Sequence, residues 1–269
     1  MSPSIRWDVA GASALLLLLV LCFASRAIAA GGAGHDLRIA VAANFTPVLQ
    51  RLCDAYHATR PGRCVVSSGA SGLLATQAAQ GAPFDLFFSA DRARPEQLVA
   101  SGHAVAGTRR TYAIGRLALW APGLAGGGTL ERTLADPSLG TLSIANPDAA
   151  PYGAAALAVL DALGYPRGGR PRVVQGANVA QAFQFVESRA ADAGLVARAQ
   201  LVEYAVTRGA PPPGRVVEVP PALHAPIEQQ VVLLTRAADA RDARAFLDYL
   251  GSAEARRIIE AAGYALPPS

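Results

Sequence analysis

Charged residues are scarce in this chain, and the basic ones are not clustered. Of the 269 residues, 16% are charged and 52% are hydrophobic, and the formal net charge is +4. The basic residues are almost all arginine and are scattered, without the basic stripe and interleaved aromatic residues of a nucleic-acid surface. The composition therefore argues against nucleic-acid binding, while the length is ample for one large core or two smaller ones.

Long apolar runs are missing after the first thirty residues. Residues 9–23 form an uncharged apolar run behind Arg6, and Ala27-Ile28-Ala29 has the small-x-small form of a cleavage site. The run is shorter than the ~20 residues of a membrane-spanning helix. Leu21 stands before Cys22, where a lipoprotein signal would have a small residue. We interpret residues 1–29 as a secretory signal peptide and expect an exported, soluble protein without a lipid anchor.

Cysteine is also scarce. Only Cys53 and Cys64 follow the predicted signal peptide. In an oxidising compartment such a pair favours a disulfide, here between a predicted helix and the strand after it, over two buried free thiols. There is no CxxC motif and no cluster of Cys and His residues, and the four histidines are scattered, so the sequence predicts no free metal cation and no redox site.

The predicted elements alternate between strand and helix, which is typical of parallel sheets covered by helices. The segments predicted as strands are 37–42, 64–68, 84–89, 141–145, 173–175, 193–197 and 216–219.

Two further apolar segments indicate that the chain crosses between two lobes. Residues 111–121 predict a strand that leaves the first lobe, and residues 227–235 predict a return to it. We therefore expect two α/β lobes with a cleft between them. Lobe one would comprise residues 30–112 and 225–269, and lobe two residues 113–224.

Four predicted strand-to-helix turns carry small or neutral polar residues. They are Ala43-Asn44, Ala70-Ser71, Ala150-Pro151-Tyr152 and Asn178-Val179. Ligands of open α/β sheets bind outside the carboxyl ends of the strands, so two turns from each lobe should meet across the cleft. Backbone N–H groups at helix starts bind anions with help from the helix dipole. Asn44, Ser71 and Tyr152 would add neutral side-chain donors.

None of the four turns contains Lys, Arg or His, or a carboxylate. An anion held by neutral donors needs many hydrogen bonds, each contributing roughly 1.5–3 kcal/mol. Six or seven could supply the ~8–12 kcal/mol of a micromolar to nanomolar site. A site of donors alone also favours a fully deprotonated dianion, because a protonated phosphate would find no acceptor for its O–H group.

Plainer interpretations remain open for each residue. Ser71 could be an ordinary N-cap, Asn44 could cap the first helix, and Tyr152 could be a packing aromatic with its hydroxyl at the surface. Val179 could be core filling unless its N–H is used. A secreted hydrolase with Ser71 as nucleophile lacks support, because the GASG run is not a GxSxG elbow and no base is suitably placed.

At these residues the sequence resembles the periplasmic molybdate-binding proteins, the substrate-binding components of molybdate ABC transporters. The likeness covers essentially the whole chain after the signal peptide. It lies in the segments AVAANFTPVLQRL, VVSSGASGLLATQAAQGAPFDLFFSAD, TYAIGRLALW, IANPDAAPYG, GANVAQAF and IIEAAGYALP.

The resemblance implies a type II periplasmic-binding-protein fold of two lobes that closes on one tetrahedral oxyanion, with no catalysis. The family's ligand positions fall on Ala43, Asn44, Ser71, Tyr152 and Val179, with Ala70 and Asn178 as supporting residues. Ala43 departs from relatives that carry a hydroxyl there, so only its backbone can serve.

The implied function is high-affinity capture of molybdate and tungstate, as ligands rather than cofactors, by a monomer that delivers them to a membrane permease. Sulfate would be discriminated mainly by size. A binder of sulfate, thiosulfate or phosphate, or an oxyanion sensor without transport, remains the alternative.

Overall fold

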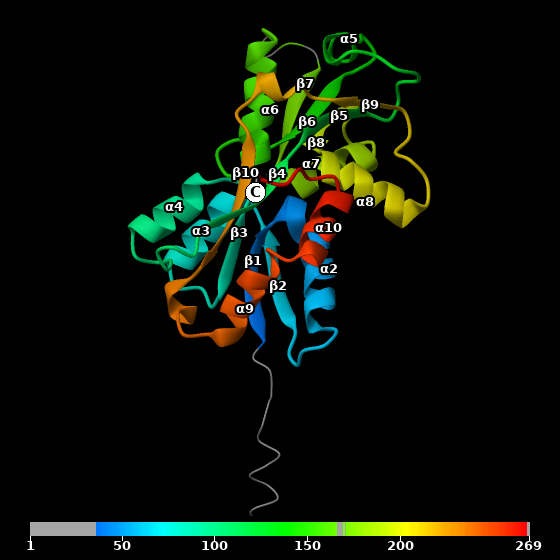
Figure 1. Cartoon of the computed structure of the whole chain (residues 1–269). Helices are drawn as coiled ribbons and strands as arrows, with labels where there is room; N and C mark the ends of the chain where they lie inside the picture. The colour runs from blue at the N-terminus through cyan, green and yellow to red at the C-terminus, as the bar shows by residue number, and fades with distance from the viewer. Residues whose placement is uncertain (1–35, 166–168, 170, 268–269) are drawn as a thin grey trace, which may run out of the picture.

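Two five-stranded sheets organise the chain, each flanked by helices and forming one lobe (Figure 1). The structure is a computed structural model and describes residues 36–165, 169 and 171–267. The predicted signal peptide, with Cys22, lies outside the described residues. Within them, no helix has the length and apolarity required to cross a membrane.

Lobe one contains the sheet with strand order β2-β1-β3-β10-β4. β1 pairs parallel with β2 and β3, whereas β10 is antiparallel to β3 and β4 because it returns from the other lobe. β1 is almost continuously buried, as expected for a central strand covered on both faces. The strands are β1 (Leu37–Ala42), β2 (Cys64–Gly69), β3 (Leu86–Ser89), β4 (Arg110–Gly115) and β10 (Ile227–Leu233), and the helices are α2 (Thr46–His57), α3 (Ser71–Ala79), α4 (Ala93–Ala100), α9 (Arg241–Tyr249) and α10 (Ala253–Ala261).

Lobe two contains the sheet with strand order β7-β6-β8-β5-β9. β6 pairs parallel with β7 and β8, and β5 is antiparallel to β8 and β9. The strands are β5 (Leu117–Ala121), β6 (Thr141–Ala145), β7 (Arg172–Gly176), β8 (Ala193–Ala197) and β9 (Arg215–Glu218), and the helices are α5 (Leu130–Leu134), α6 (Pro151–Ala162), α7 (Val179–Glu187) and α8 (Arg198–Arg208). Three short 3-10 helices complete the described elements: η1 (Ala43–Phe45), η2 (Pro221–Leu223) and η3 (Thr235–Ala237).

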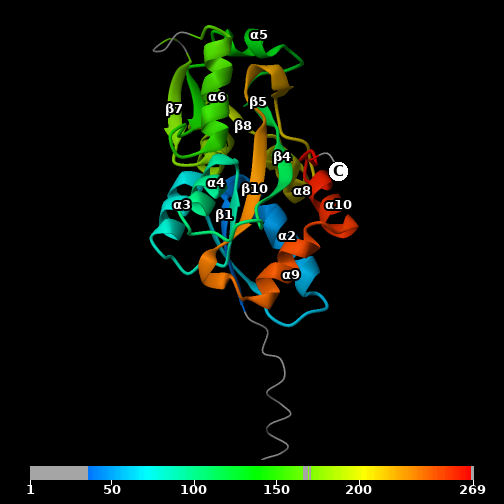
Figure 2. The same cartoon turned by 60° about the vertical axis from the view of Figure 1, so that its left-hand side comes forward.

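The lobes exchange the chain at two places. The apolar segment predicted as one strand, 111–121, is in fact two strands that belong to different sheets and are separated by Arg116 alone. The second crossing runs from the end of β9 through η2 to β10. Figure 2 shows β4 and β10 at this junction. The division at 112/113 and 224/225 lies close to these crossings, and we retain it as a proposal for the units that move.

The helix α8 was not predicted from the sequence. It starts without a Ser, Thr, Asp or Asn cap, at Ala197, and Gln200 compensates by accepting a hydrogen bond from the Ala197 N–H at 3.1 Å. Only Ala199 and Leu201 of this helix are buried, so its apolar stripe is short. Both features weaken the signals by which a helix is found in a sequence.

Cys53 on α2 and Cys64 on β2 are joined by a disulfide, the pairing favoured over free thiols. It spans a sequence separation of 11 residues, and a loop of that size is expected to contribute ~2–3 kcal/mol to stability. The bond fixes the helix that follows the first turn of the site against the strand that precedes the second turn.

Candidate functional site

The four predicted turns meet around one small cavity between the lobes, with a volume of about 10 Å³. All seven residues that the sequence assigned to the site or to its support lie in its wall. The lining residues are Ala42, Ala43, Asn44, Gly69, Ala70, Ser71, Ala90, Ala150, Pro151, Tyr152, Asn178 and Val179. The only ionisable side chain among them is the hydroxyl of Tyr152, which is neutral, so the wall carries no formal charge.

Ser71 is the first residue of α3, and its side chain is 1% exposed. The interpretation of Ser71 as an ordinary N-cap is wrong, because the cap position is Ala70 and no side chain caps this helix. Instead, Ser71 Oγ accepts a hydrogen bond from the backbone N–H of Ala90 at 3.0 Å. That bond uses a lone pair of the oxygen, so the hydroxyl hydrogen stays available for a ligand.

Tyr152 is the second residue of α6, after Pro151. Because proline has no N–H group, Tyr152 carries the first free backbone N–H of this helix. The side chain is 1% exposed, so the alternative of a hydroxyl at the surface is wrong. Its Oη accepts from Gln229 Nε2 at 3.2 Å, which again leaves the hydroxyl hydrogen available.

Burial holds Tyr152 in its neutral form. Desolvation raises the pKa of its hydroxyl well above 10, with a smaller contribution from Tyr264, and the hydrogen bond from Gln229 opposes the shift. The group is therefore an uncharged O–H donor at any physiological pH.

Asn44 lies in η1, and the structure corrects both expectations for its side chain. It does not cap α2, whose cap position is Phe45 without a side-chain hydrogen bond. Its amide nitrogen donates to Gln229 Oε1 at 2.9 Å and to the Tyr264 hydroxyl at 3.0 Å. Tyr264 in turn donates to the Asn44 carbonyl oxygen at 2.8 Å. Both amide hydrogens are thus used within the protein, and Asn44, which lines the cavity, keeps its backbone N–H as a donor for a ligand.

The first residue of α7 is Val179, and Asn178 caps the helix. Asn178 Oδ1 accepts from the N–H groups of Ala180 and Gln181 at 3.0 and 3.1 Å. The cap therefore serves the second and third N–H groups of the helix, and the first, on Val179, lies in the cavity wall. Ala43 has no hydroxyl and can contribute only its backbone and a methyl group.

Buried aromatic rings pack around the first turn of the site, which is η1. The ring of Phe45 lies 4.5 Å from that of Tyr112 and 5.3 Å from that of Tyr264. These contacts hold η1 in place, so the N–H groups at the end of β1 are preorganised rather than mobile.

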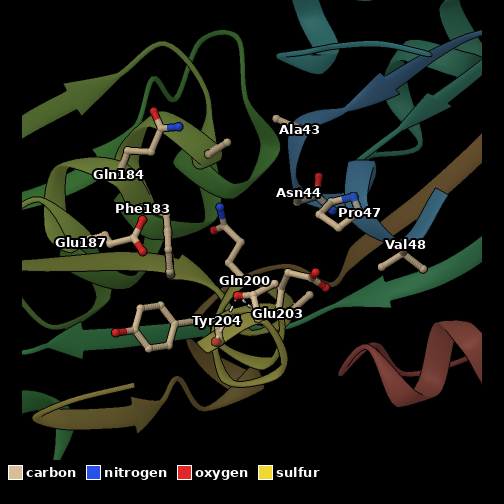
Figure 3. Close-up of a pocket in the computed structure, with 13 residues that line it drawn as sticks. Ala43, Asn44, Pro47, Val48, Phe183, Gln184, Glu187, Gln200, Glu203 and Tyr204 are labelled. Atoms are coloured by element: carbon tan, nitrogen blue, oxygen red, sulfur yellow. Dashed lines mark hydrogen bonds between the residues drawn. The ribbon is translucent and has the colours of Figure 1, made fainter. Parts of the chain in front are cut away.

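A second and larger cavity, of about 240 Å³, adjoins the first and shares Ala43 and Asn44 with it. Figure 3 shows Pro47 and Val48 on one side of it and residues of α7 and α8 on the other. Glu187 and Glu203 line it, paired with Arg208 at 3.0 Å and with Arg51 at 2.6 Å. These carboxylates disfavour a dianion, so the smaller, uncharged cavity is the better anion site.

Several contacts hold the lobes together around the small cavity. The Gly72 N–H donates to the Ala149 carbonyl at 2.9 Å, and Arg94, which also pairs with Asp91, donates to the Asp148 carbonyl at 3.1 Å. On the other side, the Arg51–Glu203 ion pair joins α2 to α8. The turns of the two lobes are therefore brought within reach of one small ion.

Three residues of this site were not found from the sequence: Gln229, Tyr112 and Tyr264. Tyr112 donates to Gln229 Oε1 at 3.0 Å, and Tyr264 bonds to Asn44. Gln229 also bonds to Asn44 and to Tyr152. The available signal was the pair Gln229-Gln230 within the predicted strand 227–235, since a buried polar side chain in a strand needs partners.

The chain matches the family model described as bacterial extracellular solute-binding protein over residues 37–265. It is 37% identical over 252 residues to the molybdate-binding protein ModA of Azotobacter vinelandii, covering 92% of this chain and 97% of that protein. It is 38% identical over 259 residues to ModA of Rhodobacter capsulatus, covering 95% of each.

A solved structure shows the same arrangement of the chain. The periplasmic molybdate-binding protein of Azotobacter vinelandii superposes with a TM-score of 0.80 at 38% sequence identity, over 87% of this chain and 100% of that one. Among the described residues, no group of three or more His, Cys, Asp or Glu side chains is placed to hold a metal cation.

Proposed function

The chain belongs to the bacterial extracellular solute-binding proteins and, within them, to the ModA type of periplasmic molybdate-binding protein, and from this premise we propose that its small interlobe cavity binds molybdate. It is a binding protein and not an enzyme, and molybdate is its ligand rather than a cofactor. The positions proposed to contact the ion are Ala43, Asn44, Ser71, Tyr152 and Val179.

The observation that carries the proposal is the direction of the hydrogen bonds in the cavity wall. Ser71 Oγ and Tyr152 Oη each accept from an N–H group of the protein, so the hydroxyl hydrogen of each remains free to donate to the ligand. The helix starts at Ser71, Tyr152 and Val179 add backbone N–H groups and the positive ends of three helix dipoles. A fully deprotonated dianion accepts hydrogen bonds at every oxygen, so it matches this set of donors.

Tungstate has the same charge, shape and nearly the same size as molybdate, and we extend the proposal to it. Sulfate offers the same kind of acceptors on a smaller tetrahedron, so it would leave longer and weaker hydrogen bonds. Phosphate at neutral pH carries at least one proton, which the wall cannot accept.

We propose that the protein opens and closes by bending at its two interlobe crossings, near Arg116 and between β9 and β10. A ligand favours the closed form because only there does it contact the turns of both lobes. We also propose that a signal peptide at residues 1–29 exports the protein and that it is a monomer. It would deliver its ligand to the permease of an ABC transporter.

Isothermal titration of residues 30–269 with molybdate, tungstate, sulfate and phosphate tests the ligand. The proposal predicts one-to-one binding of the first two with little heat from the other two. Tight binding of sulfate or phosphate would keep the fold and overturn the ligand, and no binding of any oxyanion would overturn the function.

A further inference from the structure

Gln229 is a fully buried polar residue on β10, the strand by which the chain re-enters lobe one. The pairing of β10 with β4 is irregular at this point, with a register shift between Gln229 and Gln230. Such an irregularity re-aims a side chain relative to its neighbours. Here it lies at the junction between the two sheets, beside the cavity wall.

The side chain of Gln229 connects the binding turns of both lobes. Its Oε1 accepts from Asn44 Nδ2 at 2.9 Å and from the Tyr112 hydroxyl at 3.0 Å, both in lobe one. Its Nε2 donates to Tyr152 Oη at 3.2 Å, in lobe two. A neutral side chain must accept on one side and donate on the other to make these contacts, and of the side chains of this length glutamine does so without having to take up a proton.

Space for this contact is provided by Gly115 at the end of β4. A Cβ atom at that position would lie 2.8 Å from Gln229 Nε2 and would also overlap the Tyr152 hydroxyl. The absence of a side chain at residue 115 is therefore a condition for the Gln229–Tyr152 hydrogen bond.

We propose that Gln229 is a positioning residue. By bonding to Asn44 in lobe one and Tyr152 in lobe two, it fixes which groups of the cavity wall donate hydrogen bonds to the ligand. Because its Nε2 donates to Tyr152 Oη, the tyrosine hydrogen is directed away from Gln229 and is free to donate to the ligand. Because its Oε1 holds the Asn44 amide, that side chain stays out of the cavity and the Asn44 N–H faces it. This inference rests on the proposed function, since it concerns how the same site selects an ion that only accepts hydrogen bonds.

The substitution Q229E tests the inference with almost no change of shape. The introduced carboxylate can only accept, so Tyr152 would turn its hydrogen towards it and present a lone pair to the ligand, next to a new negative charge. We expect molybdate affinity at about pH 8 to fall roughly 100-fold or more, and to recover towards about pH 5.5 as the buried carboxyl group, whose pKa burial raises, becomes protonated.

The tyrosines around Gln229 do not ionise in that pH range. The three tyrosines near Gln229 have pKa values raised by burial, so they stay neutral: Tyr112, Tyr152 and Tyr264. The charged groups nearby are ion-paired: Glu228 with Arg92 at 3.4 Å, and Asp91 with Arg94.

Q230E is the matched control. Gln230 is the next residue on the same strand, is 6% exposed, and bonds to Arg109 and Thr111 rather than to the site. The affinity of Q230E for molybdate should stay within about threefold of the wild-type value at each pH. The affinity of the wild type should itself vary by no more than about threefold across this pH range.

The measurement is titration calorimetry of wild type, Q229E and Q230E between about pH 5.5 and 8, with thermal melts to confirm folding. If the wild type binds and Q229E binds equally well, or weakly at every pH, the role of Gln229 is refuted while the function stands. If neither wild type nor Q230E binds an oxyanion, the proposed function fails.

Should Q229E not fold, Q229L and Y152F replace it in a double-mutant cycle. Q229L should weaken molybdate binding roughly tenfold in the wild-type background and clearly less in the Y152F background, because the hydroxyl that it misdirects is then absent. Equal losses in the two backgrounds would contradict the inference.

Discussion

At the scale of single residues, the site depends on hydroxyl groups whose hydrogen is not used by the protein. Ser71 Oγ is occupied by the Ala90 N–H and Tyr152 Oη by Gln229, so their hydrogens remain for the ligand. A hydroxyl can both donate and accept. Here the bond to the protein uses each hydroxyl only as an acceptor, so its donor hydrogen is left for the ligand. Replacing either hydroxyl should therefore affect binding more than folding.

Ser71→Ala should weaken molybdate binding by about 1–3 kcal/mol, because one charge-assisted hydrogen bond is lost and the Ala90 N–H loses its partner. The melting temperature of the ligand-free protein should change little. Ser101→Ala serves as the control, since Ser101 bonds to Gln97 at the exposed end of α4. Calorimetric titration of both variants checks this, and unchanged affinity in Ser71→Ala would remove Ser71 from the site.

Tyr152→Phe separates the hydroxyl from the packing of the ring. We expect a loss of about 1–3 kcal/mol in affinity with a melting temperature near that of the wild type. Because burial raises the pKa of Tyr152 above 10, the wild-type hydroxyl stays protonated below that pH, and its ionisation should not weaken binding up to about pH 9. A titration series from neutral pH upwards checks both points. A variant that binds as tightly as the wild type would show that Tyr152 acts only through its N–H or its packing.

At the scale of elements, the site is built from the first turns of helices that follow parallel strands. α3, α6 and α7 each begin at the carboxyl end of a strand, and their starting N–H groups converge from both lobes. The caps decide which N–H groups stay free. Asn178 takes those of Ala180 and Gln181, so that of Val179 remains at the cavity.

Position 178 can separate capping from charge. Asn178→Ala should lower the free energy of unfolding by about 0.5–2 kcal/mol through loss of the cap, with a moderate loss of affinity. Asn178→Asp should keep the cap and the stability but lose more affinity, because its carboxylate lies beside the dianion. Chemical unfolding and calorimetry on the two variants check the crossed pattern. Parallel changes in stability and affinity would contradict it.

Much of this arrangement could be predicted from local sequence, and what could not depends on distant contacts. The turns at Ser71, Tyr152 and Val179 were found because small and polar residues follow apolar strands. The bonds of the Asn44 side chain were not predicted, because its partners, Gln229 and Tyr264, lie 185 and 220 residues away. No local pattern shows that an amide hydrogen is already used by such a partner.

At the scale of the whole molecule, the two crossings and the interlobe contacts set how the cleft moves. The chain passes from one sheet to the other at residue 116 and at residues 219–226. The Arg51–Glu203 ion pair and the Gly72–Ala149 hydrogen bond join the two lobes on opposite sides of the cavity. Arg51 and Glu203 are partly exposed, so their pair should contribute only ~0–1 kcal/mol. The ligand would then supply most of the free energy of closure.

Small-angle scattering should therefore show a smaller radius of gyration with saturating molybdate than without ligand, in the wild type and in Arg51→Ala alike. Arg51→Ala should bind molybdate within about fivefold of the wild-type affinity, in keeping with a weak ion pair. A radius that does not respond to molybdate would contradict closure on the ligand.

The structure of the complex with molybdate, located by the anomalous scattering of molybdenum, tests the central claim most directly. The account predicts the ion in the small cavity, with its oxygens within hydrogen-bond distance of Ser71 Oγ, Tyr152 Oη and the backbone nitrogens of Asn44 and Val179, and with the Asn44 amide still bonded to Gln229. Molybdate in the larger cavity beside Glu187 and Glu203, or an arginine side chain in contact with the ion, would contradict it.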